Sequence, residues 1–223
     1  MKKTILLFSA LLIFGNLSAQ DKAALVNPII GTNGMGHTFP GACVPFGLVQ
    51  LSPDTDTIPH NVDGKYQPRA YEYCAGYQHK DSSIVGFSHT HFSGTGHSDL
   101  GDILIMPATG ELKLNPGTAT DPDGGYRSRF SHDTEVSRPG YYEVMLADYG
   151  VKAQLTATKR VGVHKYTFPK EAKNQRIILD MIHGIYNYDG KVLWTNIRVE
   201  NDTLVTGYRI TNGWARTNYT YFA

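Results

Sequence analysis

Apolar and polar side chains alternate with a period of two through much of the chain after Gly47. The clearest stretch is Gly140–Thr158, where apolar side chains stand at every second position on both sides of Asp148-Tyr149-Gly150. This period is typical of strands that bury one face, and Asp and Gly between two such runs indicate a turn. The stretch therefore predicts an antiparallel hairpin.

Shorter alternating runs predict further strands. After the first twenty residues, no stretch of a dozen residues has the apolar spacing of an amphipathic helix. Many short strands separated by Gly, Pro and Asp favour an all-β fold, an antiparallel β-sandwich, although single-residue alternation also fits a closed barrel. Two segments without strand character, Asn27–Pro45 and Pro53–Gln78, are expected to be long loops. The further strands are expected at Leu48–Leu51, Ile84–Ser88, Ile103–Met106, Gly162–Phe168, Arg176–Asp180, Val192–Glu200, Thr203–Thr211 and Tyr219–Phe222.

The N-terminus has the three parts of a secretory signal. Lys2 and Lys3 precede the apolar run Ile5–Phe14, and Ala19 supplies a small residue for cleavage. The run is too short for a permanent membrane anchor, which needs about 20 apolar residues. We therefore expect residues 1–19 to be removed, and residues 20–223 to form a domain that is exported to the periplasm or the extracellular space, with no membrane span.

Composition narrows the possible partners. The chain carries 21 Lys and Arg against 20 Asp and Glu, a net charge of +1, and the basic residues form no stripe. We therefore expect no nucleic-acid partner. The only two cysteines, Cys43 and Cys74, could pair in an oxidising compartment, but two buried thiols fit the sequence equally well. Because the chain ends inside the apolar run Tyr219–Phe222, we expect the domain to be truncated at its C-terminal edge.

The densest group of polar and titratable residues is Ser88–Asp102. His89 and His91 follow an apolar strand, so the period of two predicts that they point to one face. Three interpretations remain open: a polar subsite for a small molecule, a transition-metal site with His97, or side chains that satisfy loop backbone groups. The residues that the subsite interpretation uses are His89, His91, Ser93, Gly94, Thr95, Gly96 and Asp99.

Two other segments carry side chains suited to a sugar. Gly31–Ala42 has four glycines around His37 and Phe39, whose rings could bond hydroxyls and stack on a sugar face. Tyr71 and Tyr73 offer flat apolar surfaces with polar tips, although Phe39 and both tyrosines also suit ordinary core packing.

A glycosidase needs a general acid and a base on either side of the scissile bond. None of the Asp and Glu residues stands in a sequence context that marks it as such an acid, so the sequence predicts no catalytic residue in this chain. A nucleophile elbow and a dinucleotide-binding fingerprint are also absent from the sequence.

Several long motifs occur in order through the first half of the chain and carry a resemblance to a known family. They are Val26-Asn27-Pro28-Ile29-Ile30-Gly31-Thr32, Gly36-His37-Thr38-Phe39-Pro40-Gly41-Ala42, Val44-Pro45-Phe46-Gly47, Gln50-Leu51-Ser52-Pro53-Asp54, Gly86-Phe87-Ser88-His89-Thr90-His91, Ser93-Gly94-Thr95-Gly96 and Ser98-Asp99-Leu100-Gly101-Asp102. The sequence from about Val26 to its last residue resembles the N-terminal domain of glycoside hydrolase family 92.

The resemblance implies a calcium-dependent, inverting exo-α-mannosidase that acts on α-mannoside glycans. It also implies an N-terminal β-sandwich followed by an (α/α)₆ barrel, which supplies the acid, the base and most calcium ligands and is missing here. This chain would then line the substrate cleft and be inactive alone. By motif position, the cleft residues would be His37, Phe39, Tyr71, Tyr73 and the residues of Ser88–Asp102 named above.

One departure from the family pattern concerns the two tyrosines. The family often has Trp where this chain has Tyr71 and Tyr73, so the stacking role and the sugar preference are not carried over unchanged. The alternative is a self-standing carbohydrate-binding or interaction module without hydrolase activity.

Overall fold

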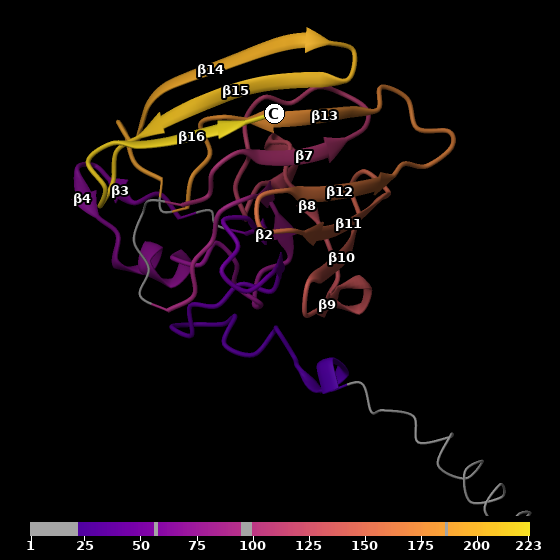
Figure 1. Cartoon of the computed structure of the whole chain (residues 1–223), viewed down its shortest axis with the longest axis horizontal. Helices are drawn as coiled ribbons and strands as arrows, with labels where there is room; N and C mark the ends of the chain where they lie inside the picture. Colours follow the sequence, from indigo (N-terminus) through magenta and orange to yellow (C-terminus); the bar gives the residue numbers. More distant parts are fainter. Residues whose placement is uncertain (1–21, 56–57, 95–99, 186) are drawn as a thin grey trace, which may run out of the picture.

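The computed structural model describes residues 22–55, 58–94, 100–185 and 187–223, which are almost entirely β-strand and loop (Figure 1). The expected all-β class is confirmed, and the signal peptide expected at residues 1–19 lies outside the described part. No helix among the described residues is long and apolar enough to cross a membrane. The short 3₁₀ helices there are η1 (Lys22–Leu25), η2 (Pro68–Tyr73), η3 (Pro122–Gly124) and η4 (His132–Thr134).

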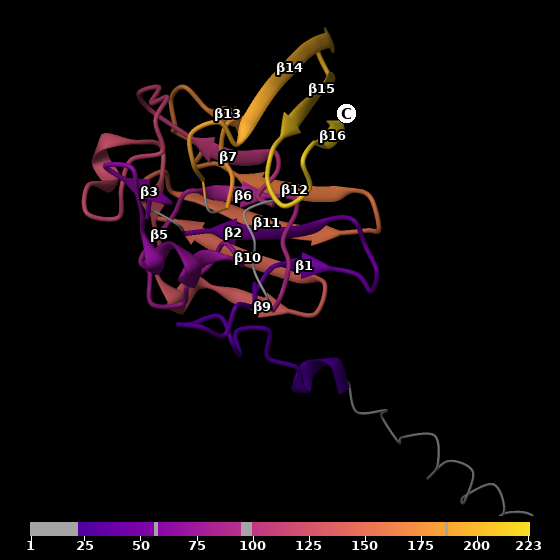
Figure 2. The ribbon, with the colours of Figure 1, turned by 90° about the vertical axis from the view of Figure 1, so that its left-hand side faces the viewer.

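Two antiparallel sheets contribute side chains to one main core, and Figure 2 shows their strands. The larger has the strand order β1-β2-β6-β7-β13, and the smaller has the order β12-β11-β10-β9. Their strands are β1 (Ala42–Cys43), β2 (Gln50–Asp54), β6 (Gly86–Ser88), β7 (Leu104–Ala108), β13 (Arg176–Asp180), β9 (Val136–Arg138), β10 (Tyr141–Leu146), β11 (Val151–Ala157) and β12 (Gly162–Thr167).

The predicted hairpin is confirmed as β10 and β11. Buried and partly exposed residues alternate along β10, and Val144 pairs with Ala153 across the hairpin. Burial of the apolar face stabilises the pairing, at about 25 cal/mol for each Å² removed from water. The core formed with the other sheet comprises Leu51, Phe87, Leu104, Met106, Tyr142, Val144, Leu146, Val151, Ala153 and Leu155, all buried.

The two predicted long loops contain short strands. β1 lies within Asn27–Pro45, and β2 continues through Pro53 to Asp54, where the pattern predicted an end at Leu51. A proline removes one donor from a sheet ladder, so a sequence pattern ends the strand too early here. Two small ribbons complete this region: β3 (Asn61–Val62) with β4 (Lys65–Tyr66), and β5 (Ser83–Ile84) with β8 (Ser128–Arg129).

A third sheet projects from the sandwich (Figures 1 and 2). It has the order β14-β15-β16, with β14 (Val192–Asn201), β15 (Leu204–Thr211) and β16 (Asn218–Phe222). Much of it faces solvent although its sequence is apolar: Val199 is 72% exposed. The other exposed apolar side chains of this region are Leu193, Trp194, Ile197, Leu204, Val205, Trp214, Tyr219 and Tyr221.

Buried cations anchor this sheet at its base. Arg209 of β15 is fully buried, its Nε lies 3.0 Å from Asp102 Oδ1, and its Nη1 donates to the carbonyl of His183. The Nζ of Lys191, also fully buried, donates to the carbonyls of Leu100 and Ile185. Removal of either partner from such a pair leaves an uncompensated charge, so these contacts fix where the sheet leaves the sandwich.

The structure decides whether the two cysteines pair, which the sequence left open. Cys43 and Cys74 are not joined by a disulfide; the first is half-buried in β1 and the second is buried just after η2. Burial raises the pKa of the Cys43 thiol, so the protonated form is favoured there.

Candidate functional site

A fully buried carboxylate lies between two histidines at the centre of the site. Asp54 ends β2, and its Oδ1 lies 2.8 Å from His91 Nε2. Its Oδ2 lies 2.8 Å from His183 Nε2. The antiparallel pairing of β2 with β6 places the loop after Ser88 beside the start of β2, which explains how His91 reaches this position.

The charge on Asp54 is maintained by its neighbours. Burial raises the pKa of this carboxyl, but the charges and hydrogen bonds of His91 and His183 outweigh it and hold the pKa well below its usual range. His91 Nδ1 lies 2.7 Å from the carbonyl of Gln50. Since both ring nitrogens of His91 face acceptor oxygens, both hydrogen bonds form together only when the ring is doubly protonated.

Two further residues hold this arrangement. Asp180 Oδ1 accepts the backbone N–H groups of Ile182 and His183, at 2.7 and 2.9 Å, which positions His183 for Asp54. Gly76 packs directly on Asp54 with φ of +82°; a Cβ there would lie 2.1 Å from Asp54 Oδ1. The close approach and the left-handed backbone both require glycine.

Five of the residues predicted from sequence gather beside this carboxylate. The Phe39 ring lies 5.4 Å from the His91 ring, and His37 makes an edge-to-face contact of 4.8 Å with Tyr71. The N–H of Gly94 donates to the carbonyl of His37 at 2.8 Å. We call His37, Phe39, Tyr71, His91 and Gly94 the aromatic cluster. Gly94 is exposed and the Phe39 and Tyr71 rings are partly exposed, so the cluster reaches the surface.

Two of the other predicted residues, His89 and Tyr73, make their contacts apart from the aromatic cluster. His89 Nδ1 bonds the carbonyl of Ile103 at 2.7 Å, and its Nε2 lies 3.0 Å from His164 Nε2. Tyr73 is 3% exposed and donates its hydroxyl to Asp81, as the packing alternative expected. Ser93 is exposed next to Gly94, whereas Thr95, Gly96, His97 and Asp99 lie outside the described residues.

The expectation that His89 and His91 point to one face is not met. Their side chains share no hydrogen-bond partner: His89 contacts β12, and His91 contacts β2. The reason is that β6 ends at Ser88, so the strand rule for alternate side chains no longer applies to the two histidines.

His183 also lines a hollow of about 550 Å³. Ile58, Val85, Ile182 and Tyr188 contribute to its lining. Because His183 also bonds Asp54, the hollow and the aromatic cluster are joined through the same buried carboxylate.

Comparisons with known proteins identify the family. The sequence model of one protein family, the glycosyl hydrolase family 92 N-terminal domain, matches residues 25–223. The chain belongs to this family. It is 46% identical to the GH92 α-mannosidase BT3965 from Bacteroides thetaiotaomicron, solved in complex with mannoimidazole, with a TM-score of 0.79 over 89% of this chain and 24% of that one.

More distant relatives agree with this assignment. The solved GH92 glycosyl hydrolase ccman5 is 27% identical, with a TM-score of 0.68 over 90% of this chain and 26% of that one. A secreted glycosidase of uncharacterised activity from Arthroderma benhamiae is 30% identical over 158 residues, 67% of this chain and 18% of the relative. The chain thus spans about a quarter or less of the length of these GH92 relatives.

The carboxylates at the site of this GH92 domain are already neutralised. Asp54 is paired with two histidines, and Asp102 is paired with Arg209. Burial raises the pKa of Asp81, but this carboxyl accepts the Tyr73 hydroxyl. Each of these three carboxylates thus has a partner within the domain.

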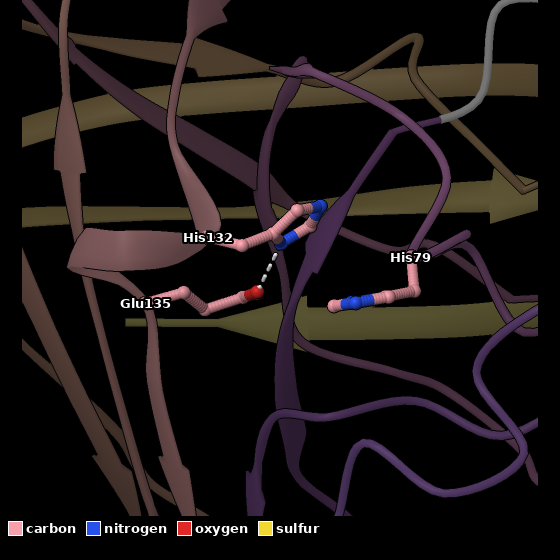
Figure 3. A group of neighbouring side chains, drawn as sticks. All are labelled: His79, His132 and Glu135. Atoms are coloured by element: carbon pink, nitrogen blue, oxygen red, sulfur yellow. Dashed lines mark hydrogen bonds and ion pairs between the residues drawn. The ribbon is translucent and has the colours of Figure 1, made fainter.

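Among the described residues, no converging group of side chains is rich in the oxygen ligands that calcium takes. Calcium takes six to eight oxygen ligands. Across the described ranges, the only group of three His, Cys, Asp or Glu side chains whose ligand atoms converge is His79, His132 and Glu135, which is rich in nitrogen (Figure 3). The alternative transition-metal site of His89, His91 and His97 does not suit His91, because Gln50 and Asp54 occupy both of its ring nitrogens.

Sequence reasoning missed Asp54 and His183 as parts of the site. Asp54 stands in one of the motifs that carry the family resemblance, so its position held a signal. His183 follows the strand β13 in an ordinary apolar context, and its contact with Asp54 spans 129 positions. Only the folded chain brings the two together.

We predict that Asp54→Asn destabilises the domain strongly. The substitution removes the charge between His91 and His183 and leaves one acceptor oxygen where two buried donors each had their own, which should lower the free energy of unfolding by about 3–5 kcal/mol. Urea denaturation followed by circular dichroism measures the change. As a control, Asp123→Asn alters an exposed partner of Arg129 and should leave the midpoint nearly unchanged. Equal effects of the two variants would contradict the role given to Asp54.

The paired histidines His89 and His164 predict a dependence of stability on pH. Burial and the neighbouring His89 lower the pKa of His164 to about 3, and burial lowers that of His89 as well. Unfolded histidine titrates near 6.5. The unfolded chain therefore binds more protons as the pH falls from about 6.5 towards 3, and stability should fall by up to about 1.4 kcal/mol per pH unit for each histidine.

Urea denaturation across this pH range measures that slope. His164→Gln should reduce it, because one titrating ring is lost. Tyr166→Phe removes only the hydroxyl that contacts His164 Nδ1 and should keep both titrating rings and most of the slope. If His164→Gln leaves the slope unchanged, the pH dependence of stability does not come from these histidines.

Proposed function

We propose that this chain forms one wall of the substrate cleft of an exported exo-α-mannosidase, which hydrolyses terminal α-mannosyl residues of glycans with inversion. The observation that supports this most directly is the 46% identity to an α-mannosidase solved with mannoimidazole. The aromatic cluster adds a physical reason: partly exposed rings and backbone groups at the surface suit a sugar.

The aromatic cluster would contact the mannoside. The Phe39 and Tyr71 rings supply flat apolar surface for the C–H face of a sugar, and the hydroxyl of Tyr71 adds a polar tip. His91, held by Asp54, would keep Phe39 in place through the contact between their rings. Ser93 and Gly94 on the exposed loop would add hydrogen-bonding groups.

The proton transfers would be carried out by groups outside this chain. An inverting glycosidase holds an acid and a base about 6.5–9.5 Å apart across the sugar. Here Asp54 and Asp102 are committed to buried ion pairs. Calcium, which the family resemblance implies, would likewise be held mainly by residues outside this chain, because the described side chains do not form an oxygen-rich set.

The projecting sheet would pack against the remainder of the longer protein, in this proposal a helical (α/α)₆ barrel domain. Apolar side chains spread over β14–β16 are costly to leave in water, and contiguous exposed patches of this kind mark interaction surfaces. The chain accounts for only 24% of the solved α-mannosidase, so ample partner surface exists in that relative.

Export is part of the same proposal. The charged start, the apolar run and the small residue at Ala19 have the pattern of a secretory signal. One relative is named as a secreted glycosidase. Periplasmic and extracellular destinations both fit the signal.

A hybrid enzyme tests the role in the cleft. Residues 20–223 would replace the matching N-terminal domain of BT3965, and hydrolysis of an aryl α-mannoside would be measured. We expect the hybrid to be active and the present chain alone to be inactive. Phe39→Ala or Tyr71→Ala in the hybrid should lower kcat/KM about tenfold or more, which corresponds to about 1.4 kcal/mol of lost stabilisation. Val161→Ala, in an exposed turn, is the matched control.

The hybrid enzyme and the chain alone also distinguish this proposal from the alternative function. Turnover by the chain alone would contradict the proposed division of labour. Tight binding of mannobiose to the chain alone, measured by calorimetry, would favour the self-standing carbohydrate-binding module if both ring variants of the hybrid kept full activity.

The projecting sheet predicts self-association of the chain on its own. Val199 pairs with Val205 across β14 and β15, and Ile197 lies on the same face. Replacement of Ile197 and Val199 by Lys should reduce oligomer formation, because charges oppose the burial of that face. Light scattering after gel filtration, over a range of concentrations, measures it. Val163→Lys on exposed β12 serves as the control, and a monomeric wild-type chain would contradict the prediction.

A further inference from the structure

A second histidine and carboxylate group lies away from the aromatic cluster (Figure 3). His79 stands in the segment after η2, His132 begins η4, and Glu135 follows η4 directly. Each offers one ligand atom, and these atoms all lie within 4.8 Å of one another. Figure 3 shows the three side chains pointing toward a common point from two separate segments.

Glu135 is held rigidly by buried donors. Its side chain is 3% exposed, and its carboxylate accepts the hydroxyl of Tyr77 at 2.9 and 3.0 Å and the hydroxyl of Tyr142 at 2.6 Å. Burial, together with the charge of Glu135, raises the pKa of both tyrosines, so their hydroxyls stay protonated and donate. Oriented carboxylates with hydrogen-bonded outer partners are characteristic of metal sites.

The two imidazoles complete the group from the solvent side. His132 Nδ1 lies 2.7 Å from Glu135 Oε2, and the rings of His79 and His132 lie 4.0 Å apart at 34°. Two imidazolium rings at this separation would repel each other, whereas two neutral rings can both donate lone pairs to a cation. The His132 side chain is 38% exposed, which leaves a path for an ion and for water.

We propose that His79, His132 and Glu135 bind a divalent transition-metal ion, with zinc as the best match. Two imidazole nitrogens and one carboxylate oxygen form a common zinc set, with water in the remaining position. A tetrahedral ion with ligand bonds of about 2.0–2.1 Å needs ligand atoms roughly 3.3 Å apart. The His132–Glu135 contact therefore opens by roughly 0.6 Å when the ion replaces the shared proton. Calcium fits this set poorly because it prefers six or more oxygens.

The ion would brace the segment that carries part of the aromatic cluster. The N–H of His79 donates to the carbonyl of Thr32 at 2.8 Å, and the neighbouring Gln78 bonds both backbone groups of Gly34. An ion bound by His79, His132 and Glu135 together would tie the segment that carries His79, and the Thr32–Gly34 loop bonded to it, to the β9–β10 side of the sandwich. The site is independent of the proposed mannosidase role, since no residue of the aromatic cluster is a ligand.

Metal binding to the full chain, expressed without a histidine tag, tests the proposal. Equilibrium dialysis against Zn²⁺ with elemental analysis should show one ion per chain, and Co²⁺ should give the visible absorption bands of a four-coordinate site. His79→Gln and His132→Gln should each weaken Zn²⁺ binding at least about tenfold. Saturating Zn²⁺ should raise Tm, and excess Ca²⁺ should not displace it.

Matched variants make the outcome decisive. His60→Gln, which removes a histidine outside the group, should leave Zn²⁺ binding unchanged. Tyr77→Phe removes the hydroxyl that donates to Glu135 and lies 3.4 Å from His79 Nδ1, and it should weaken binding about tenfold without changing the circular dichroism spectrum. Absence of stoichiometric zinc in the wild-type chain would overturn the proposal and leave a hydrogen-bonded His132–Glu135 pair with a stacked ring. Undiminished binding by the His79→Gln, His132→Gln double variant would overturn it as well.

Discussion

The buried charge of Asp54 is the constraint on which the rest of the site depends. A carboxylate with no exposed surface is tolerated only when cations and hydrogen bonds compensate its lost hydration. His91 and His183 supply that compensation from 37 and 129 positions along the chain. One electrostatic requirement therefore joins β2, the loop after β6 and the segment after β13, and the contact of Gly76 with the carboxylate adds a fourth segment.

The surface of the site follows from this interior. His91 is fixed by Asp54, Phe39 packs on His91, and the loop that carries Gly94 is tied to His37. Contacts that are already in place before a ligand arrives bind it at lower entropic cost. The same arrangement pairs the buried carboxylate of Asp54 with two histidines.

The sandwich and the projecting sheet are stabilised in different ways. The sandwich buries its alternating apolar faces between two sheets, whereas β14–β16 is anchored at its base through Arg209 and Lys191 and leaves apolar side chains in water. A sheet supported by buried cations at one edge holds its position but does not bury its own apolar surface. This difference is the physical basis for our proposal that the sheet contacts another domain. The chain also spans only part of the length of its GH92 relatives, which is consistent with that proposal.

The sequence alone determined the all-β class, the β10–β11 hairpin and the bounds of strands such as Arg176–Asp180, because one-sided burial leaves a period of two in the residue pattern. Motif order also indicated the family. Tertiary structure alone decided that His89 and His91 diverge, that His183 meets Asp54, and that His79 lies beside His132 and Glu135. Those contacts join residues far apart in sequence, and local periodicity carries no information about which distant loops fold together.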